Sequence, residues 1–574
     1  MAEVKKVLSN KLPREVYRAL EDIVGAPYIS EDRAIMETYS KYSIDCPGYL
    51  KKYARDPSNI PACVVLPGTT EEVQAICRVA SRYDIKINPF TNGQFLLSAP
   101  TTPDPTIFIH VSRMNWVEID EDTMSARLGA YADYGQLQAE AMKKGLWNGG
   151  TPLATTLCKL SSQSAFVGVW QTDHKYGTLS RNIISIKVVM PTGEALETGS
   201  KTTAGVDDFW EFGPGPDLLS LMRGCAGTSG VITEITVKLH PWPGGSELPE
   251  PEAGRPSIPT YADARYDTPP FPQRHKLLWV EFDGMETELK ALREIANSGI
   301  GIGLNATGVY NAYYCSPTQE ITLDRVKNHF FPPYNCYVII QGITSDKQVA
   351  YEEMVMREII SEVGGRFLSE EYKPEVLEAL APWNLDCIRH ATGFRMNRFN
   401  YAGSMVPGGS LEEIAYKTQK VWGKALDTFG GETYITDRGG VDDMPFLYSI
   451  NKGGRFWLSE VDVYPNSTDP AAIERANGMV LAATINLFAE KIGLAPTGIG
   501  ISFEPLTSFF PEMGPNAYLL FRKIRSVFDP QGLCAPGRQI FTKEEYDRFP
   551  DAILTAINKM RQLHGMSPVE KEEV

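Results

Sequence analysis

The sequence predicts an α+β protein of more than one domain, and three observations support this fold class. Between residues 61 and 245, β-branched runs of strand length alternate with turn residues. Residues 246–274 are rich in proline and glycine, which interrupt helices and sheets and are typical of a linker. From residue 275 to 500, strand-like runs alternate with amphipathic segments, which favours an antiparallel sheet with helices on one face. We expect residues 1–60 to form an irregular N-terminal arm with a few helical turns, and residues 501–574 a C-terminal segment.

Length, charge and cysteine content limit the classes of function. A chain of 574 residues that is 43% hydrophobic can form two or more cores. A net charge of −15 argues against nucleic-acid binding, which needs clustered lysine and arginine, although a local pocket can still hold an anionic ligand. The nine cysteines include no Cys-x-x-Cys pair, so we expect no disulfide framework and no metal site. Because neither a signal peptide nor a membrane-spanning apolar run is visible, we expect a cytoplasmic protein without a membrane span.

The first domain is predicted to begin with a β-α-β unit. Residues 62–66 and 85–87 are rich in Val and Ile and resemble two strands. Between them, Thr69 stands three residues before Glu72, which is the spacing of a capping box, and apolar residues then follow at helical spacing. Short strands are expected at 107–110 and 126–128, and a helix at 134–144 that ends at Gly145.

A hairpin and a glycine-rich turn follow. Residues 182–190 form a β-branched run, and a Pro-Thr-Gly turn leads into a returning strand at 194–199. A second strand is predicted at 231–239. Gly224, Gly227 and Gly230 lie just before it, and glycines allow backbone N–H groups to approach a phosphate-bearing ligand closely.

Three motifs in this region occur in a fixed order. They are Tyr176-Gly177, the hairpin, and the strand that leads to Pro241 through Gly245. This order resembles the FAD-binding domain of the vanillyl-alcohol oxidase and 4-cresol dehydrogenase family. The resemblance implies a PCMH-type FAD-binding domain of two subdomains at 61–245 and an α+β substrate (cap) domain with an antiparallel sheet at 275–500.

The end of the chain carries a second match. A helix predicted at 516–527 is followed by Asp-Pro-Gln-Gly-Leu-Cys-Ala-Pro-Gly-Arg at 529–538. The family ends on a very similar motif, whose basic residue reaches the flavin, so the resemblance implies that Arg538 does so here. It covers most of residues 61–245 and 456–541, and it implies that the tail returns to the first domain.

The resemblance also assigns the other FAD contacts. A Pro-x-x-x-Gly loop in the family wraps the pyrophosphate, and the Asn92-Gly93 turn chemistry fits a phosphate independently. Where the family has paired glycines, this chain has small hydroxylated residues that can still present amides and hydroxyls. The predicted contacts are Pro89, Thr91, Asn92, Gly93, Gln94, Phe95, Ser161, Ser162, Gln163, Gly177, Gly227, Gly230, Val231, Ile232 and Arg538.

The chain departs from the family at the flavin tether and at the substrate. Neither Gln94 nor the segment 457–461 offers a tethering His or Tyr, so we expect non-covalent FAD, with His174 and His390 left open. The residues that hold a phenolate in the family correspond here to Ser98, Pro496 and Thr497, and the aspartate that acts near flavin N5 corresponds to Thr178. The resemblance therefore does not imply a simple para-alkylphenol substrate.

Candidate catalytic residues also lie in the cap. The segment 389–401 holds four basic residues and Tyr401, and guanidinium groups suit an anionic or carbonyl-bearing ligand, although salt bridging explains them equally well. Glu460 and Asp462 alternate along one strand, so both lie on one side, either towards a pocket as a general base or towards solvent. The predicted catalytic residues are Arg538, Tyr176, Arg398, Tyr401 and Glu460.

Three functions are compatible with these features. The first is an FAD-dependent oxidoreductase that takes hydride from an alcohol or an activated, benzylic-type C–H bond of a small organic molecule. The second is an FAD-dependent 2-hydroxy-acid dehydrogenase, and the third is a catalytically silent flavin-binding subunit of a larger complex. We expect a homodimer or higher homo-oligomer, no nucleic acid, and an electron acceptor that is oxygen, a cytochrome or another redox protein.

Overall fold

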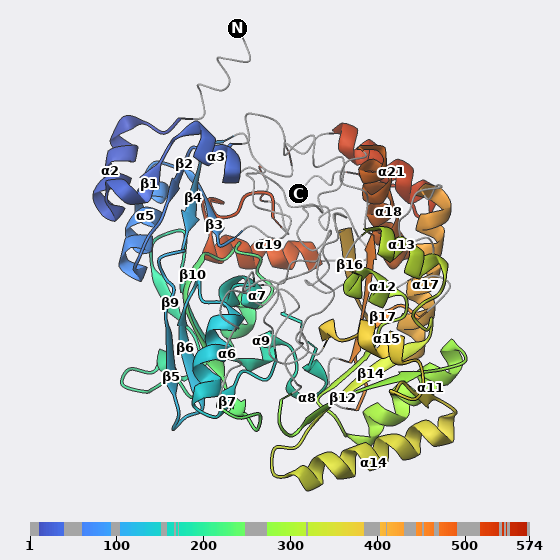
Figure 1. Cartoon of the computed structure of the whole chain (residues 1–574). Helices are drawn as coiled ribbons and strands as arrows, with labels where there is room; N and C mark the ends of the chain where they lie inside the picture. Colours follow the sequence, from blue (N-terminus) through green and yellow to red (C-terminus); the bar gives the residue numbers. More distant parts are fainter. Residues whose placement is uncertain are drawn as a thin grey trace.

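The computed structural model describes most of the chain. The described residues are 11–39, 60–92, 104–150, 158–165, 168–169, 171–246, 272–316, 319–383, 402–408, 410–429, 444–449, 453–463, 470–490, 517–538, 542, 544, 547 and 551–570. They form three main sheets, two on one side of the molecule and the third on the other (Figure 1). Among them, no helix is long and apolar enough to cross a membrane.

A four-stranded sheet lies at the N-terminal end of the molecule. Its order is β1 (Ile29–Ser30), β2 (Cys63–Val65), β4 (Thr106–His110) and β3 (Lys86–Phe90). β2 and β3 both pair with β4 in parallel, so the predicted β-α-β unit is present with β4 between its strands. α5 (Thr70–Arg82) forms the crossover helix, and the side chain of its N-cap residue Thr69 accepts from the Glu72 N–H as the capping spacing predicts.

The N-terminal arm, which the sequence predicts to be irregular with a few helical turns, contains α2 (Arg14–Val24) and β1. α2 buries Val16 and Leu20 in the same core as α5, and β1 pairs with β2. Val16, Leu20 and Val24 recur every four residues along α2, so they lie on one face of the helix, and that face is buried.

A five-stranded antiparallel sheet follows. Its order is β5 (Val117–Asp120), β6 (Ser125–Gly129), β10 (Val231–Lys238), β8 (Ile183–Val189) and β9 (Ala195–Glu197). The predicted hairpin is therefore confirmed as β8 and β9, with β10 beside β8. Three helices belong to this region: α6 (Tyr134–Lys143), α7 (Leu160–Ala165) and α10 (Leu219–Met222).

The tail of the chain returns to the first sheet, as the second motif implied. After α19 (Ala517–Phe528), Cys534 forms a parallel β-bridge with Ile87 of β3. The Ile87 N–H donates to the Leu533 carbonyl at 2.9 Å, and the Ala535 N–H donates to the Ile87 carbonyl at 2.8 Å. Residues that are about 450 positions apart in the chain thus extend one sheet.

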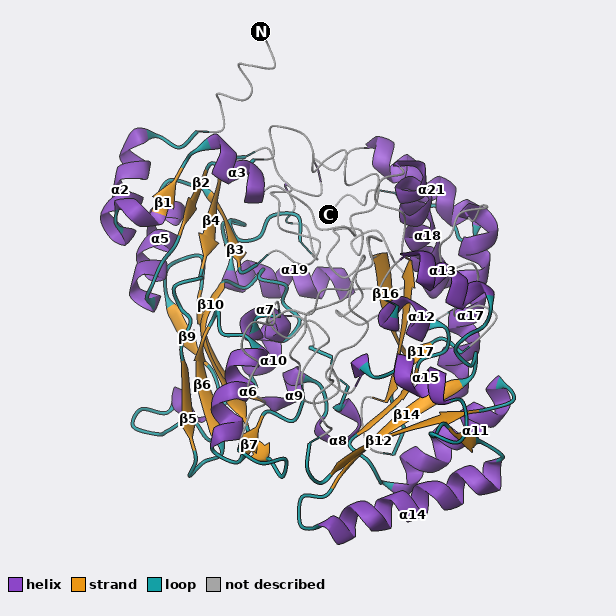
Figure 2. Ribbon diagram, in the orientation of Figure 1, coloured by secondary structure: helices purple, strands orange, loops and turns teal. Residues whose placement is uncertain are grey.

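The third sheet has seven strands and is antiparallel, which confirms the fold class predicted for the second half of the chain. Its order is β15 (Arg366–Phe367), β12 (His275–Glu281), β14 (Asn335–Gln341), β13 (Gly303–Ala306), β17 (Phe446–Ser449), β18 (Trp457–Val463) and β16 (Ala402–Gly408). Figure 2 shows its long helices on the side away from the other two sheets. They are α11 (Met285–Ser298), α14 (Asp346–Val363), α17 (Leu411–Phe429) and α18 (Pro470–Ala489).

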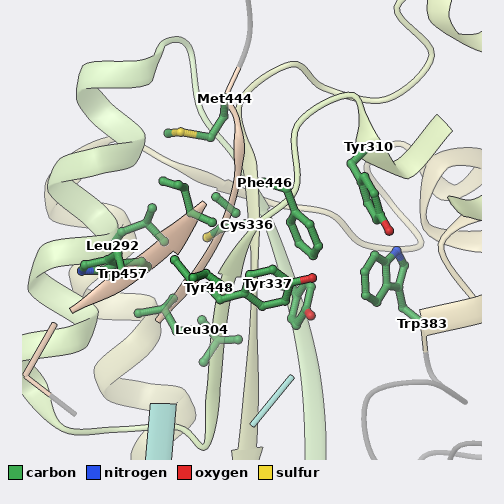
Figure 3. Packing of buried hydrophobic residues seen from close by; sticks show 14 of the residues in the cluster. Leu292, Leu304, Tyr310, Cys336, Tyr337, Trp383, Met444, Phe446, Tyr448 and Trp457 are labelled. Carbon is green, nitrogen blue, oxygen red and sulfur yellow. The ribbon is translucent and has the colours of Figure 1, made fainter. Parts of the chain in front are cut away.

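Aromatic side chains are concentrated in the core of this third sheet. Tyr310 stacks on Phe446 with ring centroids 4.5 Å apart, and Phe446 packs on Tyr448 at 4.4 Å. Trp383, which is fully buried, packs on Tyr337 at 5.2 Å (Figure 3).

The remaining elements are η1 (Ala26–Tyr28), α3 (Arg33–Tyr39), β7 (Leu146–Trp147), α8 (Asp173–Tyr176), α9 (Leu179–Asn182), η3 (Ser200–Thr202), β11 (His240–Pro241), α12 (Tyr310–Cys315), α13 (Gln319–Lys327), α15 (Pro374–Ala379) and α21 (Asp551–Leu563).

Candidate functional site

Three predicted cofactor residues from distant parts of the chain meet at one place. Gly227 has a φ of +80°, and a Cβ at this position would lie 3.5 Å from Arg538 Nη1 and 3.7 Å from Pro89 Cγ. Arg538 is only 9% exposed, and its Nη1 donates to the Ala226 carbonyl at 3.3 Å. We call Pro89, Ala226, Gly227 and Arg538 the basic cradle. A buried guanidinium beside glycine backbone is a suitable environment for an anionic group.

The local fold of the tail explains why Arg538 reaches the cradle. The Asp529 carboxylate accepts from the N–H groups of Leu533 and Cys534, both at 2.8 Å, which closes the turn after α19. Cys534 Sγ then contacts the Gly227 carbonyl at 3.2 Å. The turn is therefore fixed both to itself and to the glycine-rich loop, and the arginine follows four residues later.

α7 adjoins the same loop. The Gly224 N–H donates to the Ser164 carbonyl at 3.4 Å, and the Ala226 N–H donates to the Ala165 carbonyl at 2.9 Å. The hydroxyl hydrogens of Ser161 and Ser162 are directed to the carbonyls of Ala130 and Lys159. These two serines can therefore offer a ligand their oxygen lone pairs, and their role as cofactor contacts, like that of Gln163, stays a prediction.

Packing and backbone conformation explain the other predicted glycines and the strand that follows them. A Cβ at Gly230 would lie 2.3 Å from the Val189 carbonyl oxygen, so only glycine lets β10 approach β8 here. Val231 and Ile232 are buried and pair with β8. Gly177 has a φ of +69° and closes α8 through its N–H to the Asp173 carbonyl. Their assignment as FAD contacts stays a prediction, and packing already accounts for Gly230, Val231 and Ile232.

Tyr176 lies where the first half of the molecule contacts the third sheet. Its hydroxyl donates to Gln341 Oε1 at the end of β14, and Gln341 Nε2 in turn contacts His275 Nε2 at 2.9 Å. The Tyr176 ring packs on Trp147 and His240. Burial is the largest effect on the Tyr176 hydroxyl and raises its pKa far above the ordinary value, so Tyr176 is neutral and acts as a hydrogen-bond donor.

Further hydrogen bonds join the segment before Tyr176 to the same sheet. Asn305 Nδ2 donates to Gln171 Oε1 at 3.3 Å and to the Tyr337 hydroxyl at 2.8 Å, and Tyr337 also bonds Gln171. His174 Nδ1 and the Ser449 hydroxyl lie 2.8 Å apart. We call this set, together with Tyr176 and Gln341, the polar latch. Because Asn305 pairs with Tyr337 and with Tyr448, the sheet face that carries the aromatic residues is the one that meets residues 171–176.

Asn148 is a residue that the sequence gave no reason to select. It follows β7 and is fully buried, and within the described part of the chain neither its Oδ1 nor its Nδ2 has a hydrogen-bond partner. The next residue, Gly149, has a φ of +91°, and a Cβ there would lie 2.8 Å from Tyr176 Cγ. Asn148 is therefore held beside Tyr176, and only its unpaired burial could have revealed it.

Several predicted residues lie outside the described residues. These are Gly93, Gln94, Phe95, Ser98, Arg389, His390, Arg395, Arg398, Tyr401, Pro496 and Thr497. Thr91 and Asn92 are described at the end of β3, next to Pro89. Glu460 is described by its backbone, and the register pairs it with Phe446 and with Met405. His174, which the sequence left open as a tether, is buried within the polar latch.

The first domain matches a known protein family. Residues 61–199 match a protein family described as FAD binding domain. These residues are an FAD-binding domain. The basic cradle adjoins it and fits the cofactor, because it combines a buried cation with a glycine position where a side chain would obstruct a ligand.

Curated relatives match about a third of the chain. Alkyldihydroxyacetonephosphate synthase of Dictyostelium discoideum is 28% identical over 192 residues, which is 32% of this chain and 30% of the synthase. D-lactate dehydrogenase of Archaeoglobus fulgidus is 29% identical over 181 residues, which is 31% of this chain and 38% of the enzyme. The matched part thus spans about a third of each relative, as it does of this chain.

Solved structures match over nearly the whole chain. A p-cresol methylhydroxylase with bound substrate has a TM-score of 0.71 at 15% identity, covering 92% of this chain and 97% of that one. A 4-ethylphenol oxidase from Gulosibacter chungangensis has a TM-score of 0.69 at 17% identity, covering 92% and 98%. The FAD-binding domain and the seven-stranded sheet therefore share the fold that the sequence resemblance implied, which confirms that resemblance.

Proposed function

We propose that the protein is an FAD-dependent oxidoreductase that takes hydride from an alcohol or an activated, benzylic-type C–H bond of a small organic substrate. The observation that carries this proposal is the polar latch, which fastens the FAD-binding domain to the aromatic face of the seven-stranded sheet. A substrate between the two would meet apolar rings on one side and the cofactor on the other. Oxidation by flavin needs this kind of juxtaposition, since hydride transfer requires close approach.

The chain's own residues would divide the work. FAD, when bound, accepts the hydride. Arg538, a buried cation in the basic cradle, would offset the negative charge that the reduced cofactor carries. Tyr176 would donate a hydrogen bond, since burial keeps its hydroxyl protonated. Arg398 and Tyr401 are proposed to bind the substrate and Glu460 to remove its proton.

We propose that FAD is held without a covalent bond. Among the described residues, the one histidine left open as a tether, His174, is buried against Ser449. After acid precipitation, the yellow colour should stay in the supernatant. A pellet that retains the flavin spectrum after washing would contradict this part of the proposal.

A second function is supported by a separate observation. The similarity of the FAD-binding domain to an archaeal D-lactate dehydrogenase, together with the cluster of arginines at 389–398, favours a 2-hydroxy acid as the substrate. A catalytically silent flavin-binding subunit is the third proposal, since the positions that hold a phenolate in the resembling family carry other residues here.

One experiment separates the three proposals. The purified holoprotein is mixed anaerobically with a panel of aryl alcohols, alkylphenols, vanillyl alcohol and D- and L-2-hydroxy acids, and loss of flavin absorbance is followed. Bleaching by non-phenolic alcohols supports the first proposal, and bleaching by hydroxy acids supports the second. Flavin that is reduced by dithionite but by no substrate supports the silent subunit. Rapid bleaching by vanillyl alcohol would show that the pocket does hold a phenol.

The setting of the reaction belongs to the same proposal. We propose a cytoplasmic homodimer or higher homo-oligomer that passes electrons to oxygen, a cytochrome or another redox protein. Reoxidation of the bleached enzyme by air, compared with reoxidation by cytochrome c, distinguishes these acceptors.

A further inference from the structure

Asn148 carries an unsatisfied carboxamide in a buried place. The residue is 0% exposed, and in the described structure both its Oδ1 and its Nδ2 lack a hydrogen-bond partner. Asn88 and Asn486, which are also buried, each have one unpaired side-chain atom, whereas Asn311 donates to Thr307 and Asn335 and accepts from Trp383. Burying an amide with neither group paired is costly, so such a group in a folded protein calls for a partner that binds there.

The position of Asn148 is fixed by its neighbours. Trp147, the residue before it, pairs with His240 in the small sheet of β7 and β11. Gly149, the residue after it, lies so close to Tyr176 that a Cβ would overlap the ring, and its carbonyl accepts from the Thr172 hydroxyl. The backbone on both sides of Asn148 is therefore held by pairing, packing and a hydrogen bond.

The same neighbours connect Asn148 to the cofactor site. Trp147 and Ala226, which accepts the hydrogen bond from Arg538 in the basic cradle, both belong to the large buried cluster that includes the core of the third sheet. On its other side, Tyr176 belongs to the polar latch. Asn148 thus lies beside the polar latch, at the contact between the FAD-binding domain and the aromatic sheet, where the redox-active ring of the cofactor would meet a substrate.

We infer that the carboxamide of Asn148 binds the pyrimidine edge of the FAD isoalloxazine ring. That edge presents a ring N3–H donor between two carbonyl acceptors. A carboxamide is its complement, because Oδ1 can accept from N3–H while Nδ2 donates to a neighbouring carbonyl. Both unpaired atoms of Asn148 would then be satisfied by one ligand. The inference depends on FAD binding and not on the substrate, so it can fail without affecting the proposed function.

A chemically altered cofactor tests the inference without changing the protein. Apoprotein is titrated with FAD and with N3-methyl-FAD, and binding is followed by quenching of flavin fluorescence. Wild-type protein should bind N3-methyl-FAD about tenfold or more weakly, because the methyl group removes the donor and occupies the place of the hydrogen bond. Equal affinity for the two cofactors would overturn the inference, whatever any variant does.

A variant cycle then assigns the effect to Asn148. Asn148→Ala should weaken FAD binding by a similar factor and should lose most of its preference for FAD over the methylated form. Asn311→Ala is the matched control, since it removes a buried and satisfied asparagine of α12 and should leave the preference unchanged. If Asn148→Ala keeps the full preference, the residue holds water or substrate instead, and the inference is wrong. If that variant does not fold, Asn148→Leu, which keeps the side-chain volume and removes both polar atoms, is compared with the same pair of cofactors and should also lose the preference.

Discussion

Two parts of the cofactor, the pyrophosphate and the flavin ring, are candidates for the group that Arg538 contacts. The tail places its guanidinium against Pro89 and Gly227, beside the loop that the sequence assigned to the pyrophosphate. The family resemblance instead assigned it to the flavin ring. A buried cation suits either role. The roles differ because the pyrophosphate keeps its charge when the cofactor is reduced, whereas the flavin ring becomes negative.

We therefore predict that Arg538→Ala lowers the reduction potential of the bound flavin and slows its reduction. One lost charge interaction of about 1.4–3 kcal/mol corresponds to roughly a tenfold to hundredfold slower reaction. Arg538→Lys should recover part of the rate, because the charge is kept and only the fork geometry is lost. The measurements are the potential by dye equilibration and the rate of anaerobic bleaching.

Two other outcomes of the Arg538 experiment would have clear meanings. An unchanged potential with much weaker FAD binding would place the guanidinium at the pyrophosphate. If affinity, potential and rate are all unchanged, Arg538 does not contact the cofactor at all. Arg223, whose guanidinium is also partly buried near the same loop, provides a comparison for non-specific loss of a buried cation.

At the scale of elements, the polar latch joins α8 to β13, β14 and β17 through buried side chains. Gln341 is its central member, because its Oε1 accepts from the Tyr176 hydroxyl and from Lys175 Nζ while its Nε2 contacts His275. A cap sheet that is fastened in this way keeps a constant distance from the FAD-binding domain. Loosening the latch should therefore affect both stability and chemistry.

We predict that Gln341→Leu lowers the free energy of unfolding by about 1–3 kcal/mol, because it leaves several buried polar groups unpaired. It should also slow flavin reduction more than it weakens substrate binding. Combined with Tyr176→Phe, it should cost less than the two changes separately, by about 0.5–3 kcal/mol, since the residues share one hydrogen bond. Gln348→Leu on α14 is the control and should change little. Additive effects of Gln341→Leu and Tyr176→Phe in urea unfolding would show that the latch does not act as a unit.

Elements with a strong local pattern could be predicted from the sequence, and the structure confirms them. β8 and β10 are long β-branched runs, and α14 and α17 carry a full amphipathic pattern. β13 was not predicted, although it is central to the seven-stranded sheet. Its four residues, Gly-Leu-Asn-Ala, have weak strand propensity and are held by neighbours on both sides.

The candidate site divides in the same way. Pro89, Gly227 and Arg538 could be selected because they lie in motifs, although nothing local indicates that they meet. Asn148 and Gln341 lie in no motif. They matter because they are buried and because the partner of Gln341 is far away in the chain. A local sequence pattern shows neither property.

At the scale of the whole molecule, we expect two partly buried histidines to make stability depend on pH. Burial is the main cause that lowers the pKa of His110, on β4, and of His240, on β11, to about 4. Both are neutral in the folded protein at pH 7. In the unfolded chain, each binds a proton below about pH 6.5.

We predict that the free energy of unfolding falls as the pH is lowered from about 6.5 towards 4. In this window the unfolded chain binds more protons than the folded protein, so acid favours unfolding, by about 2 kcal/mol per histidine at pH 5. Above pH 6.5 this contribution is fully present and constant. Urea unfolding of wild type and of His240→Gln at pH 7 and pH 5 measures the change, and the variant should lose less stability on acidification. His329→Gln, at an exposed position, should behave as wild type, and equal acid sensitivity of His240→Gln and wild type would contradict the prediction.

The bridge between Ile87 and Cys534 has a consequence for how the protein is made. A ribosome releases β3 long before it reaches the tail, and the whole seven-stranded sheet is synthesised in between. The edge of β3 must therefore wait, unpaired, for a partner that arrives about 450 residues later, and closing so long a loop is slow. A nascent chain stopped anywhere before residue 538 would lack the arginine of the basic cradle. We therefore expect the cofactor to bind after translation, once the tail has added Arg538 to the basic cradle.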